Sequence, residues 1–296
     1  MTSDDVAGGL LDQLNYVGGS DGAILPPEFA FALDFDSARA WPDLPYDTAS
    51  PVSRYPLESR PQILLILEEA ANLFRSRAPK AWIFVNRELE SAMIRRSSAV
   101  NGASSSSNRE LVGTCLLTNL DLSPDPAVFI CAEALVHEAI HQHLYRIELQ
   151  KGPFCDLDDA GRYRSPWSGN RIPLHSLIHA SLVWFGVLSL WCQLARSCAN
   201  ENEALSVRSR VAPTLFGFAF IRQIVDSPAF PRGSVAPQII ELIGHIANIA
   251  TAAEPPRDEG AALGDFLRRS EKGEWVTSLV SGLEHVERSG MRDLRP

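Results

Sequence analysis

The stretch DPAVFICAEALVHEAIHQHLYRIEL, residues 125–149, is the part of the chain that most strongly determines its fold. Asp125 followed by Pro126 is a typical helix start, with Asp125 as the N-cap and Pro126 at the first helical position. We therefore predict one helix over residues 125–149. Inside it lies His137-Glu138-Ala139-Ile140-His141, an HExxH sequence.

The HExxH sequence predicts a metal site. His137 and His141 are four residues apart, so in a helix they share one face, one turn above each other. Two imidazoles in this arrangement can reach one metal ion, and Glu138 can polarise a metal-bound water or support the site. The alternative is a solvated polar helix face. The flanking residues weaken that alternative because they are apolar: Leu135, Val136, Ala139 and Ile140.

A third ligand is needed, and the next predicted helix, residues 173–199, offers two. His175 and His179 are again four residues apart, and either can complete the site. The helix contains no Asp or Glu, so it lacks the acidic ligand of the commonest helical zinc peptidases. The extended HExxHxxGxxH form is also absent, because Leu144 and Ile147 occupy its Gly and final His positions.

Three segments together point to a family. AEALVHEAIHQHLY (132–145) is followed by SPW (165–167) and LHSLIHA (174–180). This order of blocks resembles the HExxH-motif proteins associated with ribosomally made peptide natural products, which are regarded as iron(II)- and α-ketoglutarate-dependent peptide β-hydroxylases. The resemblance covers roughly residues 110–195.

The resemblance implies a site and a reaction. The metal ligands map to His137, His141 and His179, with Fe(II) as the metal and α-ketoglutarate and O₂ as co-substrates. Oxidative decarboxylation of α-ketoglutarate would then drive hydroxylation of a side chain of a precursor peptide, with or without a leader peptide. Glu138 would orient the site instead of activating water. Zn or Ni can replace iron in purified protein, because the general affinity order does not favour iron.

The distal carboxylate of α-ketoglutarate needs a fork-shaped cationic partner, which favours arginine. We favour Arg171, with Arg164 as the next choice; both lie in the predicted loop 150–172 that leads to the His175 helix. His175 and Trp167 are predicted to support the ligands or to pack beside them. A predicted strand at 111–117 is expected to offer its edge to an extended peptide.

The pattern of the whole chain predicts an α+β fold that is mostly α-helical, with a zincin-like HExxH helix, a small sheet and a helical C-terminal part. We expect an irregular segment at 1–60, a metal-binding core at 61–200 and a helical part at 201–296 that belongs to the same globule. The other elements expected are helices at 6–14, 61–77, 205–225, 237–253 and 260–288, a strand at 82–85 and a flexible loop at 101–108.

Composition excludes several classes of protein. With 27 Lys and Arg against 36 Asp and Glu, the net charge is −9, which is unsuited to a dedicated nucleic-acid binder. Residues 181–195 are apolar but too short for a membrane span, so we expect a buried helix and no membrane partner. Five cysteines without a CxxC pair, and an acidic N-terminus without an export signal, favour reduced thiols in the cytoplasm.

Two alternatives to the hydroxylase stay open at this point. The first is a zinc metallopeptidase in which Glu138 is the general base and a carboxylate is the third ligand, for instance Asp156, Asp158 or Asp159. The second is a binding protein without enzymatic activity that keeps the same scaffold.

Overall fold

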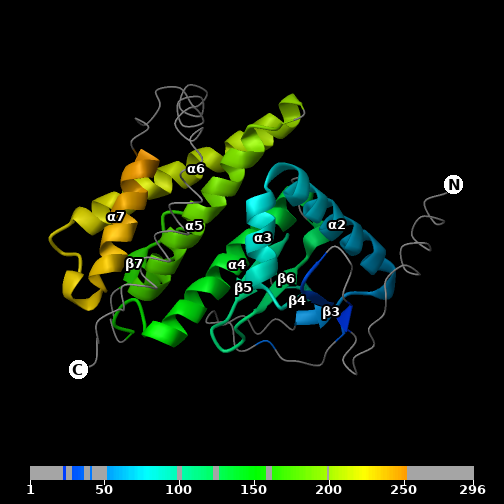
Figure 1. Ribbon diagram of the computed structural model, residues 1–296, viewed down its shortest axis with the longest axis horizontal. Coiled ribbons are helices and arrows are strands. Elements are labelled where there is room, and N and C mark those ends of the chain that lie inside the picture. Colours follow the sequence, from blue (N-terminus) through cyan, green and yellow to red (C-terminus); the bar gives the residue numbers. More distant parts are fainter. Residues whose placement is uncertain are drawn as a thin grey trace. The chain divides into compact units, whose positions relative to one another are not determined.

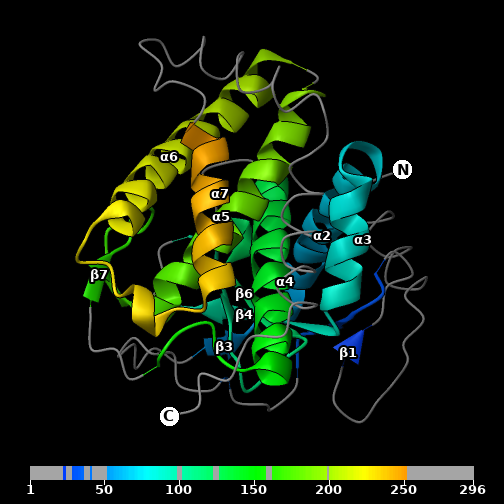
Figure 2. The same cartoon turned by 60° about the vertical axis from the view of Figure 1, so that its left-hand side comes forward.

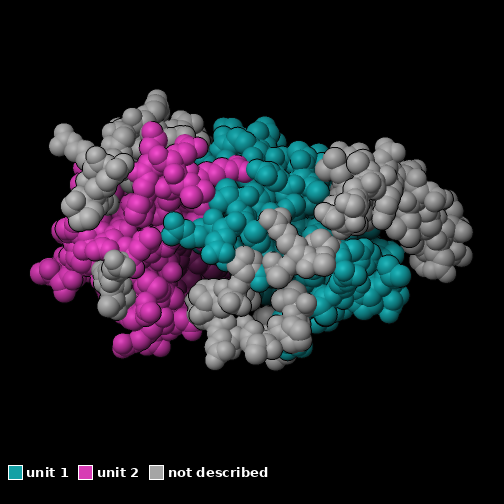
Figure 3. Space-filling view, turned by 90° about the horizontal axis from the view of Figure 1, so that it is seen from below, with its two compact units in different colours: residues 1–143 teal, residues 144–296 magenta. Residues whose placement is uncertain are grey.

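The computed structural model of the chain (Figure 1) describes residues 23–24, 29–36, 41, 52–98, 102–122, 127–157, 162–198 and 200–251. The chain forms two compact units, residues 1–143 and 144–296, coloured separately in Figure 3. The division falls inside helix α4 (Ala127–Lys151). The expected helices at 6–14 and 260–288, and the expected helix start at Asp125 and Pro126, lie outside the described residues.

Unit 1 is built on a small mixed sheet of six strands in the order β1-β2-β4-β6-β5, with β3 paired to β4. Strands β2, β4 and β6 are parallel, whereas β1, β3 and β5 each join the sheet in antiparallel fashion. Strand β6 is buried along its whole length, as expected for a central strand. The strands are β1 (Ala23–Ile24), β2 (Ala32–Asp34), β3 (Val52–Arg54), β4 (Ser91–Ser97), β5 (Ser104–Ser107) and β6 (Thr114–Thr118).

Helices α2 (Arg60–Arg77) and α3 (Pro79–Glu88) lie side by side (Figures 1 and 2) and form much of the apolar core of unit 1. A proline stands in the first turn of each helix, where its missing N–H costs nothing. The ring of Phe74 stacks on that of Trp82 with their centroids 5.4 Å apart, which joins the two helices. Short 3₁₀ turns flank these elements at Leu57–Ser59 and Leu120–Leu122.

Three expectations for unit 1 were wrong. Residues 82–85 belong to helix α3, because a four-residue apolar run fits a helix as well as a strand and Pro79 starts a helix here. Residues 104–107 of the expected flexible loop form strand β5, whose half-buried serines suit a strand with one unpaired edge. The described part of residues 1–60, expected to be irregular, contributes β1, β2 and β3 to the sheet.

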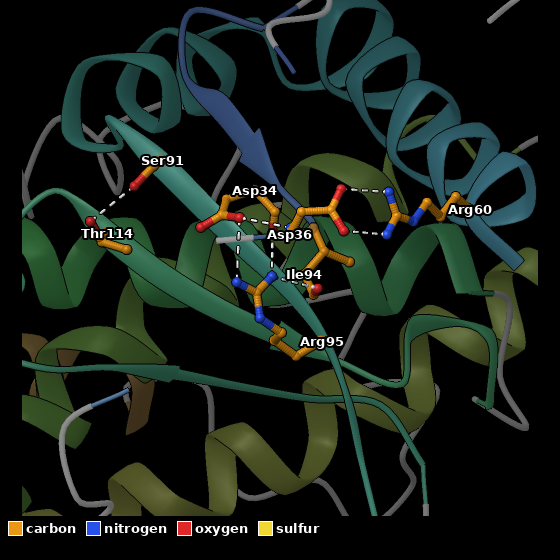
Figure 4. Close-up of polar contacts among 7 residues, drawn as sticks. All are labelled: Asp34, Asp36, Arg60, Ser91, Ile94, Arg95 and Thr114. Carbon is orange, nitrogen blue, oxygen red and sulfur yellow. Dashed lines mark hydrogen bonds and ion pairs between the residues drawn. The ribbon is translucent and has the colours of Figure 1, made fainter. Parts of the chain in front are cut away.

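A polar network links the sheet to α2 (Figure 4). Arg60 holds the carboxylate of Asp36 in a two-pronged contact, with N···O distances of 2.7 and 2.5 Å. Arg95 of β4 is buried and donates to the backbone oxygen of Asp34 at 2.5 Å and to that of Ile94 at 3.0 Å. Its guanidinium also lies 3.3 Å from the Asp34 carboxylate. These bonds compensate the burial of an arginine beside the parallel strands.

We predict that Asp36→Asn destabilises the fold in a pH-dependent way. The hydrogen bond from Arg60 holds the pKa of the Asp36 carboxyl below its ordinary value of 3.8. The stabilisation is therefore present above about pH 4 and is lost as pH falls through the folded-state pKa. Because the pair is partly exposed, we expect a loss of about 0.5–1 kcal/mol at pH 7.

The measurement is urea unfolding of both proteins at pH 7 and near pH 3, where the difference should shrink. Asp226→Asn is the control, because its partner Arg222 and Asp226 itself are both largely exposed. A constant difference between wild type and Asp36→Asn at both pH values would contradict the assignment.

Unit 2 consists mainly of three long helices, α5 (Leu174–Ala195), α6 (Glu201–Asp226) and α7 (Pro237–Thr251). Helix α6 packs against both α5 and α7. The expected loop at 150–172 contains a short antiparallel hairpin, β7 (Arg162–Arg164) and β8 (Arg171–Pro173), and both of its strands contact α5. Periodicity could not reveal strands of three residues. A 3₁₀ turn at Arg232–Ser234 precedes α7.

The expected fold class is confirmed in outline: the structure is α+β, and 63% of the described residues are helical. Helix α5 is long and apolar enough to span a membrane, but 78% of its most apolar stretch is buried within the chain. A mostly buried helix of this kind is typical of the core of a soluble protein. All five cysteines are free thiols, as expected.

Trp167 fits into unit 2 because Gly217 has no side chain. Its indole N–H donates to the backbone oxygen of Thr214 at 3.3 Å, and its ring packs on Trp184 and Phe218. A Cβ at Gly217 would overlap the indole nitrogen of Trp167. The tryptophan that the sequence singled out therefore joins the β7–β8 connection to α5 and α6.

We predict that Gly217→Ala destabilises the protein by about 1–3 kcal/mol, because the methyl group forces the half-buried indole of Trp167 to move. Gly244→Ala in α7 is the matched control, since a Cβ at that position meets nothing within 4 Å. Alanine is the better helix former, so this control should be neutral or stabilising by up to about 1 kcal/mol. Urea unfolding of the two variants measures the difference, and equal effects would contradict the packing argument.

Candidate metal-binding site

The HExxH sequence lies within helix α4, as expected. The rings of His137 and His141 are neighbours on successive turns, with centroids 5.1 Å apart. The His137 side chain is a quarter exposed, so an ion or substrate can reach it. Both histidines belong to unit 1.

Glu138 is buried, with 1% of its surface exposed. The hydroxyl of Ser105 in β5 donates to its Oε1 atom at 2.5 Å. Its Oε2 atom has no hydrogen-bond partner within the described parts of the chain. A buried carboxylate oxygen without a donor is costly, and it is the kind of group that a metal-bound water or a substrate N–H satisfies.

Gln142 fixes the HExxH turn of α4 to the sheet. Its side chain is fully buried, and its Oε1 atom accepts from the backbone N–H of Gly113 at 2.8 Å. Its Nε2 atom donates to the backbone oxygen of Thr114 at 2.7 Å. Both ends of the amide are thus used at the start of β6, which sets the position of Glu138 along the sheet.

Strand β6 (Thr114–Thr118) does not offer an edge to a peptide, contrary to the expectation for residues 111–117. It pairs with β4 on one side and β5 on the other. Strand β5 (Ser104–Ser107) is the last of the described strands on this side of the sheet. The expectation failed because the serine run, taken as a loop, occupies the edge.

The structure gathers a second set of ligand atoms, entirely inside unit 2. The carboxylate of Glu148 in α4 lies between His175 and His179 of α5. The Nε2 atom of His175 is 2.8 and 3.0 Å from the two carboxylate oxygens, and that of His179 is 3.1 Å from Oε2. One ligand atom from each residue lies within 4.8 Å of the others, close enough to hold one ion.

This cluster is well enclosed. Glu148 and His179 are 6% and 2% exposed, and the rings of Tyr145 and Phe154 pack against His179. The backbone N–H of Phe154 donates to Glu148 Oε1 at 3.0 Å. Burial alone would raise the pKa of the Glu148 carboxyl. Hydrogen bonds to His175 and His179 outweigh that effect and hold the pKa well below its usual range, so the carboxylate is charged.

Sequence reasoning missed Glu148, although a signal was available. The residue stands seven positions, about two helical turns, after His141, and so shares its face of α4. It also missed the partner of His143, whose Nδ1 atom lies 3.1 Å from the carboxylate of Glu88. The pair in α5 was recognised, but not the carboxylate that joins its two members.

The two arginines expected to bind the co-substrate are brought together by the β7–β8 hairpin. Arg164 and Arg171 are directly opposite in the antiparallel register, and both are exposed. The Nε atom of Arg164 donates to the backbone oxygen of Gly169 at 3.3 Å, which orients its side chain. Arg171 stands four residues before His175, and helix α5 begins directly after β8.

The ligand set implied by resemblance draws on both units. His137 and His141 lie in unit 1 and His179 lies in unit 2, so the set of three histidines stays a prediction. Among the carboxylates considered for a zinc site, Asp156 is exposed, and Asp158 and Asp159 lie outside the described residues.

Comparison with known proteins gives no relative: no family model matches the chain, and no curated protein is significantly similar to it.

We predict that Gln142→Met destabilises the protein by about 2–4 kcal/mol, because it removes the side-chain hydrogen bonds to two buried backbone groups, the N–H of Gly113 and the carbonyl of Thr114. Gln150→Met is the control, since that glutamine is exposed on the same helix. Chemical unfolding followed by circular dichroism measures both. If the two variants unfold alike, Gln142 does not fix α4 to the sheet.

Proposed function

We propose that this protein is an iron(II)- and α-ketoglutarate-dependent oxygenase that hydroxylates a side chain, at its β-carbon, of a ribosomally made precursor peptide. The observation that carries the proposal is the segment from β7 to the first two turns of α5. Over 18 residues (162–179) it presents paired arginines, Arg164 and Arg171, and then His175 and His179. Guanidinium groups bind carboxylates and imidazoles bind metal ions, so this one segment supplies donors for a metal together with a dicarboxylate.

The residues present fit an iron ion. Imidazole and carboxylate donors are the ligands of non-haem iron(II) oxygenases. By resemblance, His137, His141 and His179 are the ligands, and Glu138, next to His137 in the sequence, is oriented by the hydrogen bond that Ser105 donates to it. When bound, iron(II) with α-ketoglutarate and O₂ supplies the oxidising power for hydroxylation.

The charge and geometry of the Arg164–Arg171 pair favour binding of a carboxylate. Like charges directly opposite each other on paired strands repel, and both guanidiniums have five N–H donors in a planar fork. A carboxylate placed between them relieves the repulsion and accepts several hydrogen bonds. This requirement separates an oxygenase that uses α-ketoglutarate from a hydrolase, which needs no such pair.

The precursor peptide has a suitable docking edge in β5. An extended peptide can add to an edge strand through main-chain hydrogen bonds, which requires no particular side-chain sequence. Ser105 of β5 contacts Glu138, so a peptide on this edge lies close to the HExxH turn. The substrate edge that we proposed for residues 111–117 therefore moves to residues 104–107.

A zinc metallopeptidase is the second candidate, and one observation favours it. Glu138 is buried beside His137 and His141, with an oxygen that lacks a partner in the described chain, as a general base for a metal-bound water requires. Catalytic zinc also accepts two histidines and one glutamate. The arginine pair on the β7–β8 hairpin has no role in this alternative.

The net charge of −9 and the apolar, largely buried α5 agree with a protein that acts on a peptide in the cytoplasm, without nucleic acid or membrane. We include this location and these partners in the proposal.

The test is anaerobic titration of the metal-free protein with iron(II) and α-ketoglutarate, followed by visible spectroscopy. We expect the charge-transfer band of a chelated complex, and we expect His179→Ala to abolish it. Arg171→Gln should weaken α-ketoglutarate binding about tenfold or more, because a charged hydrogen-bonding partner is lost.

Arg208→Gln is the matched control. This exposed arginine of α6 lies 3.7 Å from Glu201, so the variant should bind α-ketoglutarate as wild type does. Absence of the band, together with zinc-dependent cleavage of a peptide library that Glu138→Gln abolishes, would replace the oxygenase by the peptidase.

A further inference from the structure

We infer that Glu148, His175 and His179 bind a divalent transition-metal ion as a two-histidine, one-carboxylate site within unit 2. This assignment goes beyond the proposed function, because it adds a ligand that the resemblance does not supply. It keeps His179, which the proposed function also uses, and takes Glu148 and His175 as its partners in place of His137 and His141. Metal binding at this cluster is tested without α-ketoglutarate or a peptide.

The distances within the cluster match a coordination shell. Nitrogen and oxygen ligands lie about 2.0–2.2 Å from zinc and comparable ions. Two ligands at right angles around such an ion are therefore about 3.0 Å apart. The Nε2 atom of His175 is 2.8 and 3.0 Å from the oxygens of Glu148, and that of His179 is 3.1 Å from Oε2. Each histidine nitrogen thus lies from the carboxylate at the spacing of adjacent ligands, and all three ligand atoms lie within 4.8 Å of one another.

Burial and charge supply the second argument. Glu148 is only 6% exposed, and a buried carboxylate must be compensated by hydrogen bonds or by a cation. A divalent ion held by this carboxylate and the two imidazoles supplies both charge and coordination. Both histidines direct Nε2 toward the carboxylate, which is the orientation that ligation requires.

The surroundings support ligation and leave a route of entry. The backbone N–H of Phe154 donates to Glu148 Oε1 and fixes the carboxylate, as groups behind metal ligands commonly do. The rings of Tyr145 and Phe154 shield His179. The side chain of His175 is 19% exposed, so an ion can enter from its side. Imidazole and carboxylate donors without a thiolate suit iron(II), cobalt(II), nickel(II) or zinc.

The two possible ligand sets predict opposite effects on metal binding when Glu148 or His141 is replaced. If the metal is held by His137, His141 and His179, loss of the Glu148 charge leaves all three ligands in place. If the metal is held by Glu148, His175 and His179, loss of His141 leaves all three in place. One pair of variants therefore distinguishes them.

The experiment is titration of the full-length, chelator-stripped protein with cobalt(II) alone, followed by visible absorption. Glu148→Gln keeps the size of the side chain and removes its charge. We expect it to weaken cobalt binding about tenfold or more and to change the spectrum, because an outer partner alone is worth that much. His245→Ala is the matched control, because it removes an exposed histidine of α7 that lies outside both ligand sets, and it should bind cobalt within about twofold of wild type.

A second variant, His175→Ala, tests the same site if Glu148→Gln does not fold. It removes a half-buried ligand with less disturbance of the interior, and circular dichroism confirms that each variant is folded. Loss of cobalt binding in a folded His175→Ala supports the site. Normal binding in either folded variant overturns it, as does failure of wild type to bind cobalt at micromolar concentration.

The two proposals fail in different ways. Cobalt binding that depends on Glu148, without a chelate of iron(II) and α-ketoglutarate, would leave the metal site and remove the oxygenase. A chelate that depends on His141 but not on Glu148 would keep the oxygenase and remove this site.

Discussion

Helix α4 buries three polar side chains, and the requirement that each of them find a partner shapes the structure around it. Glu138 accepts a hydrogen bond from a hydroxyl of edge strand β5. Gln142 forms hydrogen bonds with two backbone groups at the start of β6. Glu148 forms hydrogen bonds with both histidines of α5. A buried polar group without a partner costs more than a hydrogen bond gains. In unit 1 these strands, and in unit 2 helix α5, are therefore each held against the part of α4 that belongs to the same unit.

The same requirement explains why the chemistry gathers along this helix. The buried carboxylates of Glu138 and Glu148 retain polar contacts where the neighbouring residues are apolar, and each lies beside histidines. Such an arrangement adds little to stability compared with an apolar core. It is useful for holding an ion or a polar substrate, and the paired arginines of the β7–β8 hairpin add a place for an anion.

Long periodic segments were predictable, whereas short ones were not. Helices α4, α5, α6 and α7 lie close to the ranges expected from apolar spacing and from proline at helix starts. Residues 82–85 and 104–107 were assigned wrongly, because a run of four residues has no period that distinguishes helix, strand and loop. The error at 104–107 then put the edge of the sheet on the wrong strand. Edges depend on pairing with distant residues, which local sequence does not contain.

The sequence by itself determined the HExxH helix, the histidine pair of the following helix and the mostly helical α+β class, because each rests on spacing within one element. Only the tertiary structure decided that Glu148 joins His175 to His179, that Arg164 faces Arg171, and that Ser105 reaches Glu138. These contacts join residues 7 to 33 positions apart. For Glu138 and Glu148 the physical cause is the burial of a carboxyl group, which selects partners by proximity in space. The exposed Arg164 and Arg171 are brought opposite each other by the pairing of β7 with β8.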